Sequence, residues 1–209
     1  MNSIISKHWE SKNKEIDNIK IECINDIIYN KALSKIVVLP IGTSDVLVKI
    51  EIELLKSCLE INENFSVLEI GAGIGNFCKI FQEQFKVKEY TLLDTPSMLR
   101  ISKFFLDFYK VSYKTVSTDE YKILYGKKFD LCVSNMCFSE LPKKYTDDLL
   151  KNVVSNCFNT FIVDTTELEF RKDLCNKLLS YSKFENLECA GYKDFYLSNH
   201  GVYFACRNN

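Results

Sequence analysis

Three alternating glycines give the chain its clearest candidate for a ligand-binding turn. A short apolar run, residues 65–70 (FSVLEI), is followed directly by Gly71, Gly73 and Gly75. Glycine lets the main chain turn tightly and approach a ligand without obstruction by a Cβ atom. In open α/β sheets, ligands sit outside the carboxyl ends of the strands, where such a loop would lie. The segment, which includes Ala72, therefore predicts a ligand site between a strand and a helix.

The charges around this turn favour a cationic ligand over a dinucleotide. A dinucleotide fingerprint that starts at Gly71 would need glycine where the chain has Asn76. Glu69 stands two residues before Gly71. A pyrophosphate at a helix N-terminus favours nearby hydrogen-bond donors and positive charge. A carboxylate just upstream is better suited to a ligand that carries ammonium and sulfonium groups.

A second acidic residue, Asp94, ends the next apolar run, residues 90–94 (YTLLD). A carboxylate at the end of the second strand can accept hydrogen bonds from both hydroxyls of a nucleoside ribose. The alternative is purely structural, because Thr95 or Asp94 could cap a helix that starts near Ser97. The turn, Glu69 and Asp94 together favour the nucleoside interpretation.

The elements that would position these residues follow an alternating pattern after residue 64. Short β-branched or aromatic runs alternate with amphipathic helical segments, which predicts a mostly parallel sheet covered on both faces. The expected fold is a Rossmann-like, doubly wound α/β sheet of about seven strands with one antiparallel strand near the C-terminus. The predicted strands are residues 65–70, 90–94, 114–117, 129–135, 160–165, 185–190 and 201–206.

The segment before residue 64 has mostly helical periodicity. Val46, Ile50, Leu54 and Leu55, for example, recur at helical spacing. We therefore expect an N-terminal helical cap or lid at residues 1–63 and a ligand-binding domain at residues 64–209.

Residues 65–165 resemble class I S-adenosylmethionine (SAM)-dependent methyltransferases. The resemblance implies that the glycine turn wraps the methionine moiety of SAM and that Asp94 holds its ribose. It also implies that Glu69 supports the turn and the methionyl amino group. The expected cofactor-binding residues are Glu69, Gly71, Ala72, Gly73, Gly75, Asp94, Thr95, Met98, Asp119 and Asn135.

Three of these residues have roles that only the resemblance suggests. Met98 matches a position that packs on adenine, although core packing explains it equally well. Asp119 could meet the adenine amine or cap a helix. Asn135, at the end of the fourth predicted strand, matches the residue that flanks the transferred methyl group.

The acceptor is expected to be a small polar molecule with a hydroxyl group. The segments GAGIGNFCKIF, YTLLDTPSML and SNMCFSELP resemble those of bacterial sugar O-methyltransferases, which implies a sugar or nucleotide-linked sugar. A hydroxyl group benefits from a general base. Glu140, after the fourth strand, is the first candidate, and the only two histidines, His8 and His200, are the others.

Two other functions remain open. One is N-methylation of a small molecule, although the polar-Pro-Pro-aromatic motif typical of such enzymes is replaced here by Ser-Asn-Met-Cys. The other is a SAM-binding partner protein without catalysis. No carboxylate set predicts a metal site near the fourth and fifth strands.

The composition agrees with a cytoplasmic protein that acts on a small molecule. The formal net charge is −1, which argues against nucleic acid or an anionic membrane as a partner. Nine cysteines without a CxxC pair indicate reduced thiols. Neither a signal peptide nor a membrane-spanning run is expected.

Overall fold

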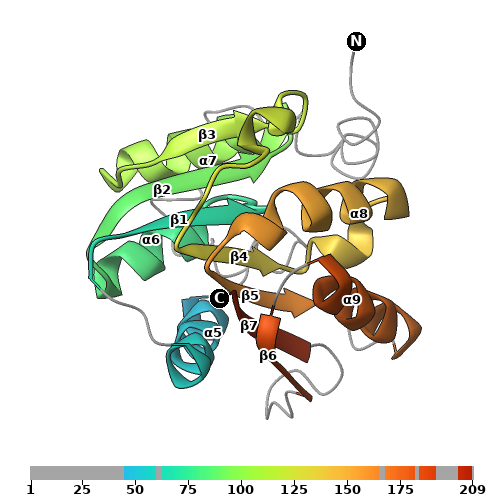
Figure 1. Cartoon of the computed structure of the whole chain (residues 1–209). Coiled ribbons are helices and arrows are strands. Elements are labelled where there is room, and N and C mark those ends of the chain that lie inside the picture. Colours follow the sequence, from blue (N-terminus) through green and yellow to red (C-terminus); the bar gives the residue numbers. More distant parts are fainter. Residues whose placement is uncertain (1–44, 60–62, 165–167, 182–183, 192–201, 209) are drawn as a thin grey trace.

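A computed structural model describes residues 45–59, 63–164, 168–181, 184–191 and 202–208. The described chain alternates strands and helices around one sheet, with the strand order β3-β2-β1-β4-β5-β7-β6 (Figure 1). The first five strands are β1 (Phe65–Ile70), β2 (Val87–Asp94), β3 (Lys114–Ser117), β4 (Leu131–Asn135) and β5 (Asn159–Asp164). The last two are β6 (Phe184–Gly191) and β7 (Val202–Asn208).

Five helices accompany these strands in the described residues. They are α5 (Asp45–Cys58), α6 (Asn76–Gln84), α7 (Pro96–Phe108), α8 (Lys143–Asn152) and α9 (Leu168–Tyr181). Short 3-10 turns follow β3, β4 and α8, namely η1 (Tyr121–Leu124), η2 (Phe138–Glu140) and η3 (Val154–Asn156). None of the described helices is long and apolar enough to cross a membrane.

The expected doubly wound sheet of about seven strands with one antiparallel strand needs one correction, which concerns the extent of the parallel sheet. The pairings among β3, β2, β1, β4 and β5 are all parallel, so the all-parallel sheet has five strands. The C-terminal strands join its edge only through antiparallel pairing, β7 with β5 and β6 with β7. A strand that returns directly beside its predecessor must run antiparallel to it, whereas the parallel strands are connected through helices.

Alternate residues of the parallel strands face two separate hydrophobic cores. Leu68 and Cys132 belong to the core covered by α8 and α9. Val67 and Val133, one residue along, belong to the core that includes residues of α5, α6 and α7. Period-two alternation within strands that are buried on both faces explains why these segments have few polar residues.

The helix α5 comes from the segment predicted to form an N-terminal cap, and its apolar side is part of the second core. Val48, Ile52 and Leu55 are fully buried, and α5 lies next to α6. The rest of the predicted cap, residues 1–44, lies outside the described residues, so the division at residue 64 stays a prediction.

Candidate active site

Main-chain hydrogen bonds hold the glycine turn after β1, and its three glycines have left-handed backbone conformations. Gly71, Gly73 and Gly75 all have positive φ, at 78°, 55° and 88°. The Gly71 N–H donates to the Leu93 carbonyl of β2 at 2.8 Å, and the Gly75 N–H donates to the Ala72 carbonyl at 2.9 Å. The turn thus ends at Gly75, the residue before α6, and leaves its middle at the carboxyl edge of the sheet, where the parallel strands end.

Gly71 also lies too close to the loop after β4 to tolerate a side chain. A Cβ atom placed on it would lie 2.6 Å from the Cys137 Cβ atom and 2.7 Å from the Cys137 Sγ atom. Gly71 therefore allows the ends of β1 and β4 to pack directly against each other, which brings Asn135 and Cys137 beside the glycine turn.

This packing predicts a large cost for Gly71→Ala. The substitution combines a left-handed backbone with a clash in a buried contact, so we expect a loss of about 3 kcal/mol or more in the free energy of unfolding. Gly126→Ala is the matched control, because Gly126 has a φ of 68° but nothing lies within 4 Å of its added Cβ. It should lose only roughly 1–2 kcal/mol. Urea denaturation measures both, and equal losses would show that the contact with Cys137 is not the cause.

Asp94 ties the glycine turn to the start of α7. Its Oδ2 atom accepts a hydrogen bond from the Gly73 N–H at 2.8 Å, and its Oδ1 atom accepts one from the Thr95 N–H at 2.6 Å. Thr95, rather than Asp94, caps α7, since its Oγ1 atom accepts from the Met98 N–H at 3.3 Å. Burial raises the pKa of Asp94 to about 6, although the hydrogen bonds from Thr95 and Gly73 oppose the rise.

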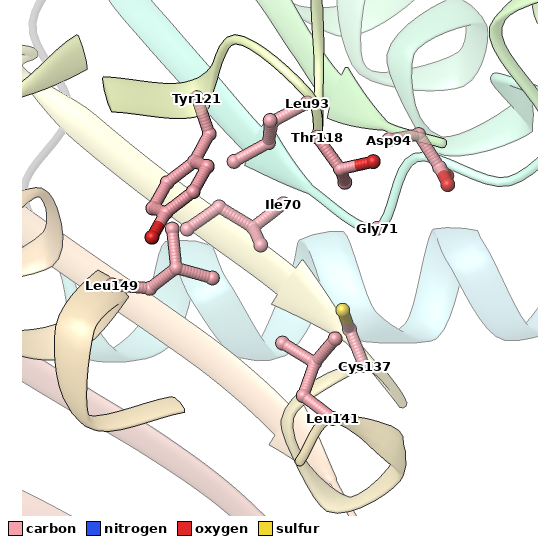
Figure 2. A pocket seen from close by; sticks show the side chains of 9 residues that line it. All are labelled: Ile70, Gly71, Leu93, Asp94, Thr118, Tyr121, Cys137, Leu141 and Leu149. Carbon is pink, nitrogen blue, oxygen red and sulfur yellow. The ribbon is translucent and has the colours of Figure 1, made fainter. Parts of the chain in front are cut away.

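A partly open pocket lies beside Asp94 at the same edge of the sheet. Figure 2 shows Gly71 and Asp94 on one side of it and Cys137 and Leu141 on the other. The remaining lining residues are Ile70, Leu93, Thr118, Tyr121 and Leu149. The lining is apolar apart from the Asp94 carboxylate and the hydroxyl groups of Thr118 and Tyr121. Such a lining is typical of small-molecule sites, and a carboxylate there can accept hydrogen bonds from ribose hydroxyls.

Two residues expected to meet adenine lie outside this lining. Asp119 is exposed, and its backbone N–H donates to the Ser117 Oγ atom at 3.1 Å. Thr118, its neighbour, lines the pocket instead. Met98 is buried in the first turn of α7, which is the core position that the sequence allowed as the alternative.

Glu69 lies on β1 directly before the glycine turn and is buried. Its Oε2 atom accepts a hydrogen bond from the Tyr90 hydroxyl at 2.8 Å. Burial, reinforced by the negative charges of Asp94 and Glu51, raises the pKa of Glu69 to about 8, against the lowering effect of the Tyr90 hydrogen bond.

Glu51, on α5, is a site residue that the sequence interpretation missed. Its Oε2 atom accepts a hydrogen bond from the Asn135 Nδ2 atom at 2.7 Å, although the two residues are 84 positions apart. Burial raises its pKa to about 8, and the Asn135 hydrogen bond opposes this. A usable signal was present, because residues 48, 51, 52 and 55 follow the spacing of one buried helix face. A glutamate on a helix face that is otherwise apolar and buried indicates a polar contact inside the core.

Of the three predicted general bases, one lies within the described residues. Glu140 ends η2 in the loop after β4 and is half-buried, and its backbone N–H donates to the Cys137 carbonyl at 3.0 Å. The same loop is held to β5, since the Ser139 N–H donates to the Asp164 Oδ2 atom at 3.1 Å. His8 and His200 lie outside the described residues.

Comparison with known proteins identifies the family of the chain. The family model for ribosomal RNA adenine dimethylase matches residues 43–187, more than half of the chain. None of the curated proteins matches.

Several solved structures share the fold at low sequence identity. The N-methyltransferase NodS from Bradyrhizobium japonicum, in complex with S-adenosyl-L-homocysteine (SAH), is 15% identical with a TM-score of 0.57, over 77% of this chain and 86% of NodS. A candidate O-methyltransferase from Nostoc punctiforme is 14% identical with a TM-score of 0.58, over 85% of this chain. The chain spans only 58% of that protein's length.

The geometry at the carboxyl edge agrees with these comparisons. A glycine turn, a buried carboxylate that accepts a hydrogen bond from it and a small pocket with a mostly apolar lining lie together in the matched region. The chain therefore belongs to the ribosomal RNA adenine dimethylase family and is a SAM-dependent methyltransferase.

Proposed function

We propose that the protein transfers the methyl group of SAM to a hydroxyl of a small polar acceptor, of the sugar or nucleotide-linked sugar type. The observation that carries the proposal is the state of the loop after β4, which borders the predicted position of the methyl group. Its one aromatic residue, Phe138, is fully buried in the core. An enzyme that modifies a base holds the extruded base between aromatic or apolar side chains. Phe138 offers no exposed ring for such stacking, and the exposed large apolar residue of this loop is Met136.

The charge of the carboxyl edge supports the same acceptor class. Glu51, Glu69, Asp94 and Asp164 are all buried there or next to it, and the net charge of the whole chain is −1. Nucleic acids bind mainly through neutralisation of their phosphates by lysine and arginine. Carboxylates and amides instead accept hydrogen bonds from the hydroxyls of a neutral sugar.

The chemistry requires positioning and one proton acceptor. SAM supplies a methyl carbon bonded to a positively charged sulfur. As the new O–C bond forms, the C–S bond breaks with its electron pair going to sulfur, and the hydroxyl proton must go to a base. The glycine turn and Asp94 would orient the cofactor, and Glu140 is the base that we assign, with His8 and His200 as the other candidates.

An acceptor screen tests the proposal. Purified protein is incubated with SAM and a panel of monosaccharides and nucleotide sugars, and the products are examined by mass spectrometry for a gain of one methyl group. A methylated sugar supports the proposal. Transfer to none of the hydroxylated acceptors, although SAM binds, would contradict it and favour a SAM-binding protein without this activity.

A second candidate is N-methylation of adenine in RNA, which the family match over residues 43–187 favours. The two candidates separate in one experiment with radiolabelled SAM, RNA containing unpaired adenines and the same sugar panel. Label in N6-methylated adenine, with none in the sugars, would replace the first proposal by the second.

The proposed base predicts a specific defect for Glu140→Gln. The amide cannot take the hydroxyl proton, so we expect kcat to fall by about 10²–10⁴-fold. The affinity for SAM should stay within about 2-fold of wild type, since Glu140 is not one of the residues that line the nucleoside pocket. Steady-state kinetics and calorimetry measure the two quantities. An unchanged kcat would remove Glu140 from the mechanism and leave the histidines to be tested.

A further inference from the structure

The pair formed by Glu51 and Asn135 joins the helix α5 to the end of β4 at the carboxyl edge of the sheet. Glu51 is 8% exposed and lies on the same side of α5 as Val48, Ile52 and Leu55, which are fully buried. A carboxylate in such a position loses its hydration, and among the described residues it regains a hydrogen bond from Asn135. Such a position is unfavourable for stability alone and is typical of a functional group.

The surroundings of this pair are acidic and lack a cation in the described part of the chain. Glu51 raises the pKa of Glu69 through its charge, and so does Asp94, so the three carboxyls lie close enough to interact. No described lysine or arginine forms an ion pair with any of the three. A cation bound among these three carboxyls would stabilise their ionised forms.

A buried oxygen atom beside the pair also lacks a hydrogen-bond donor. The Nδ2 group of Asn135 donates to Glu51, but no described residue donates to the buried Asn135 Oδ1 atom. A buried acceptor without a partner costs about 1–3 kcal/mol. Glu51 and Asn135 thus present acceptor oxygens, which suit a ligand with several N–H donors and a positive charge.

We propose that Glu51 and Asn135 bind the ammonium group of the amino-acid tail of SAM, which makes α5 part of the cofactor site. An ammonium group has three N–H donors, enough to reach the Glu51 carboxylate and the Asn135 Oδ1 atom together. In this arrangement Asp94 would hold the ribose and the glycine turn would wrap the methionine moiety, so the pair adds the recognition of the ammonium group of that moiety. The inference depends on SAM as the cofactor and not on the identity of the methyl acceptor.

Binding of the cation should be accompanied by proton release. The pKa of Glu51 is raised to about 8, so this carboxyl is mostly protonated at pH 7 in the free protein. An ammonium group stabilises its ionised form. The titratable groups that share this environment are Glu69 on β1 and Asp94 and Tyr90 on β2, together with Cys78 on α6, which interacts with Glu69.

Calorimetry with three ligands tests the assignment. SAM and SAH both have the amino-acid tail, and 5′-methylthioadenosine has the nucleoside part without it. In Glu51→Gln and in Asn135→Ala we expect the affinity for SAM and SAH to fall by about 10–100-fold, with the affinity for methylthioadenosine within about 2-fold of wild type. Glu53→Gln is the matched control, since Glu53 is an exposed glutamate on the same helix and should change none of the three affinities.

Two further measurements separate this role from a structural one. Wild type should release up to roughly one proton per SAM bound at pH 7, measured in buffers of different ionisation enthalpy, and Glu51→Gln should release fewer. A structural tie between α5 and β4 would instead give equal losses for all three ligands, or no loss. Either result, or unchanged proton release in Glu51→Gln, would overturn the proposal. A missing methyl acceptor would leave it standing, because none of these measurements involves transfer.

Discussion

Asp94→Ala is expected to weaken the binding of both SAM and SAH by about 100-fold or more. The carboxylate would accept hydrogen bonds from the two ribose hydroxyls, and each hydrogen bond to a charged group contributes roughly 1.5–3 kcal/mol. Every 1.4 kcal/mol is about a 10-fold change in affinity. The substitution also removes the acceptor for the Gly73 and Thr95 N–H groups, which hold the turn in place. Calorimetry measures the affinities.

A conservative variant and a control variant test whether the loss comes from the carboxylate of Asp94. Asp94→Asn keeps the size of the side chain but can no longer accept at both oxygen positions, so its loss should be smaller, about 10-fold. Asp107→Ala removes an exposed carboxylate on α7 that pairs with Lys103, and it should leave the affinity unchanged. If Asp94→Ala bound SAM as tightly as wild type, the ribose role of Asp94 would be wrong.

The pH dependence of cofactor binding follows from the same carboxyl. The pKa of Asp94 is raised to about 6, and its protonated form cannot accept at both oxygens. The affinity for SAH should therefore fall as the pH decreases through about 6, and this step should be absent in Asp94→Asn.

The second large effect is a loss of stability of the free protein as the pH rises from 5 to 8. Burial raises the pKa of both Glu51 and Glu69 from the ordinary value of 4.5 to about 8. Between these values the folded state holds protons that the unfolded state has released, so the stabilisation is complete below about pH 4.5. It is lost as the pH rises through about 8, with a change on the order of 3 kcal/mol per carboxyl. Urea midpoints of the ligand-free protein at a series of pH values measure it.

Glu51→Gln provides the test of this assignment. The neutral amide can still accept the hydrogen bond from Asn135, but it does not titrate. The variant should show a flatter pH profile and should be more stable than wild type at pH 8, by about 1–3 kcal/mol. Greater stability together with weaker SAM binding is the pattern expected when a strained group is kept for function. A profile parallel to that of wild type would show that Glu51 does not carry the titration.

The features that the sequence determined are local ones. The alternating glycines predicted a tight turn after β1, and all three have positive φ in the structure, a conformation that glycine adopts readily. The segments predicted as the parallel strands agree with β1 to β5 within a few residues, because strands buried on both faces have continuous apolar runs. The class of SAM-dependent methyltransferases also follows from motifs in one continuous stretch, residues 65–165. The family model that matches residues 43–187 is that of ribosomal RNA adenine dimethylase, not that of the sugar O-methyltransferases that the narrower resemblance implied.

The tertiary structure decided what depends on contacts between distant residues. Glu51 and Asn135 are 84 positions apart, and no local pattern states which strand end a buried helical glutamate will meet. Pairing of β7 with β5 in the antiparallel direction depends on how the chain returns after α9, which is not encoded in the pattern of either strand. The burial of Phe138 likewise could not be derived from its own segment of the sequence. It depends on the core that α8 and α9 complete, because the environment of a side chain depends on all the elements packed around it. The glycine turn, in contrast, depends on the conformational freedom of its own residues.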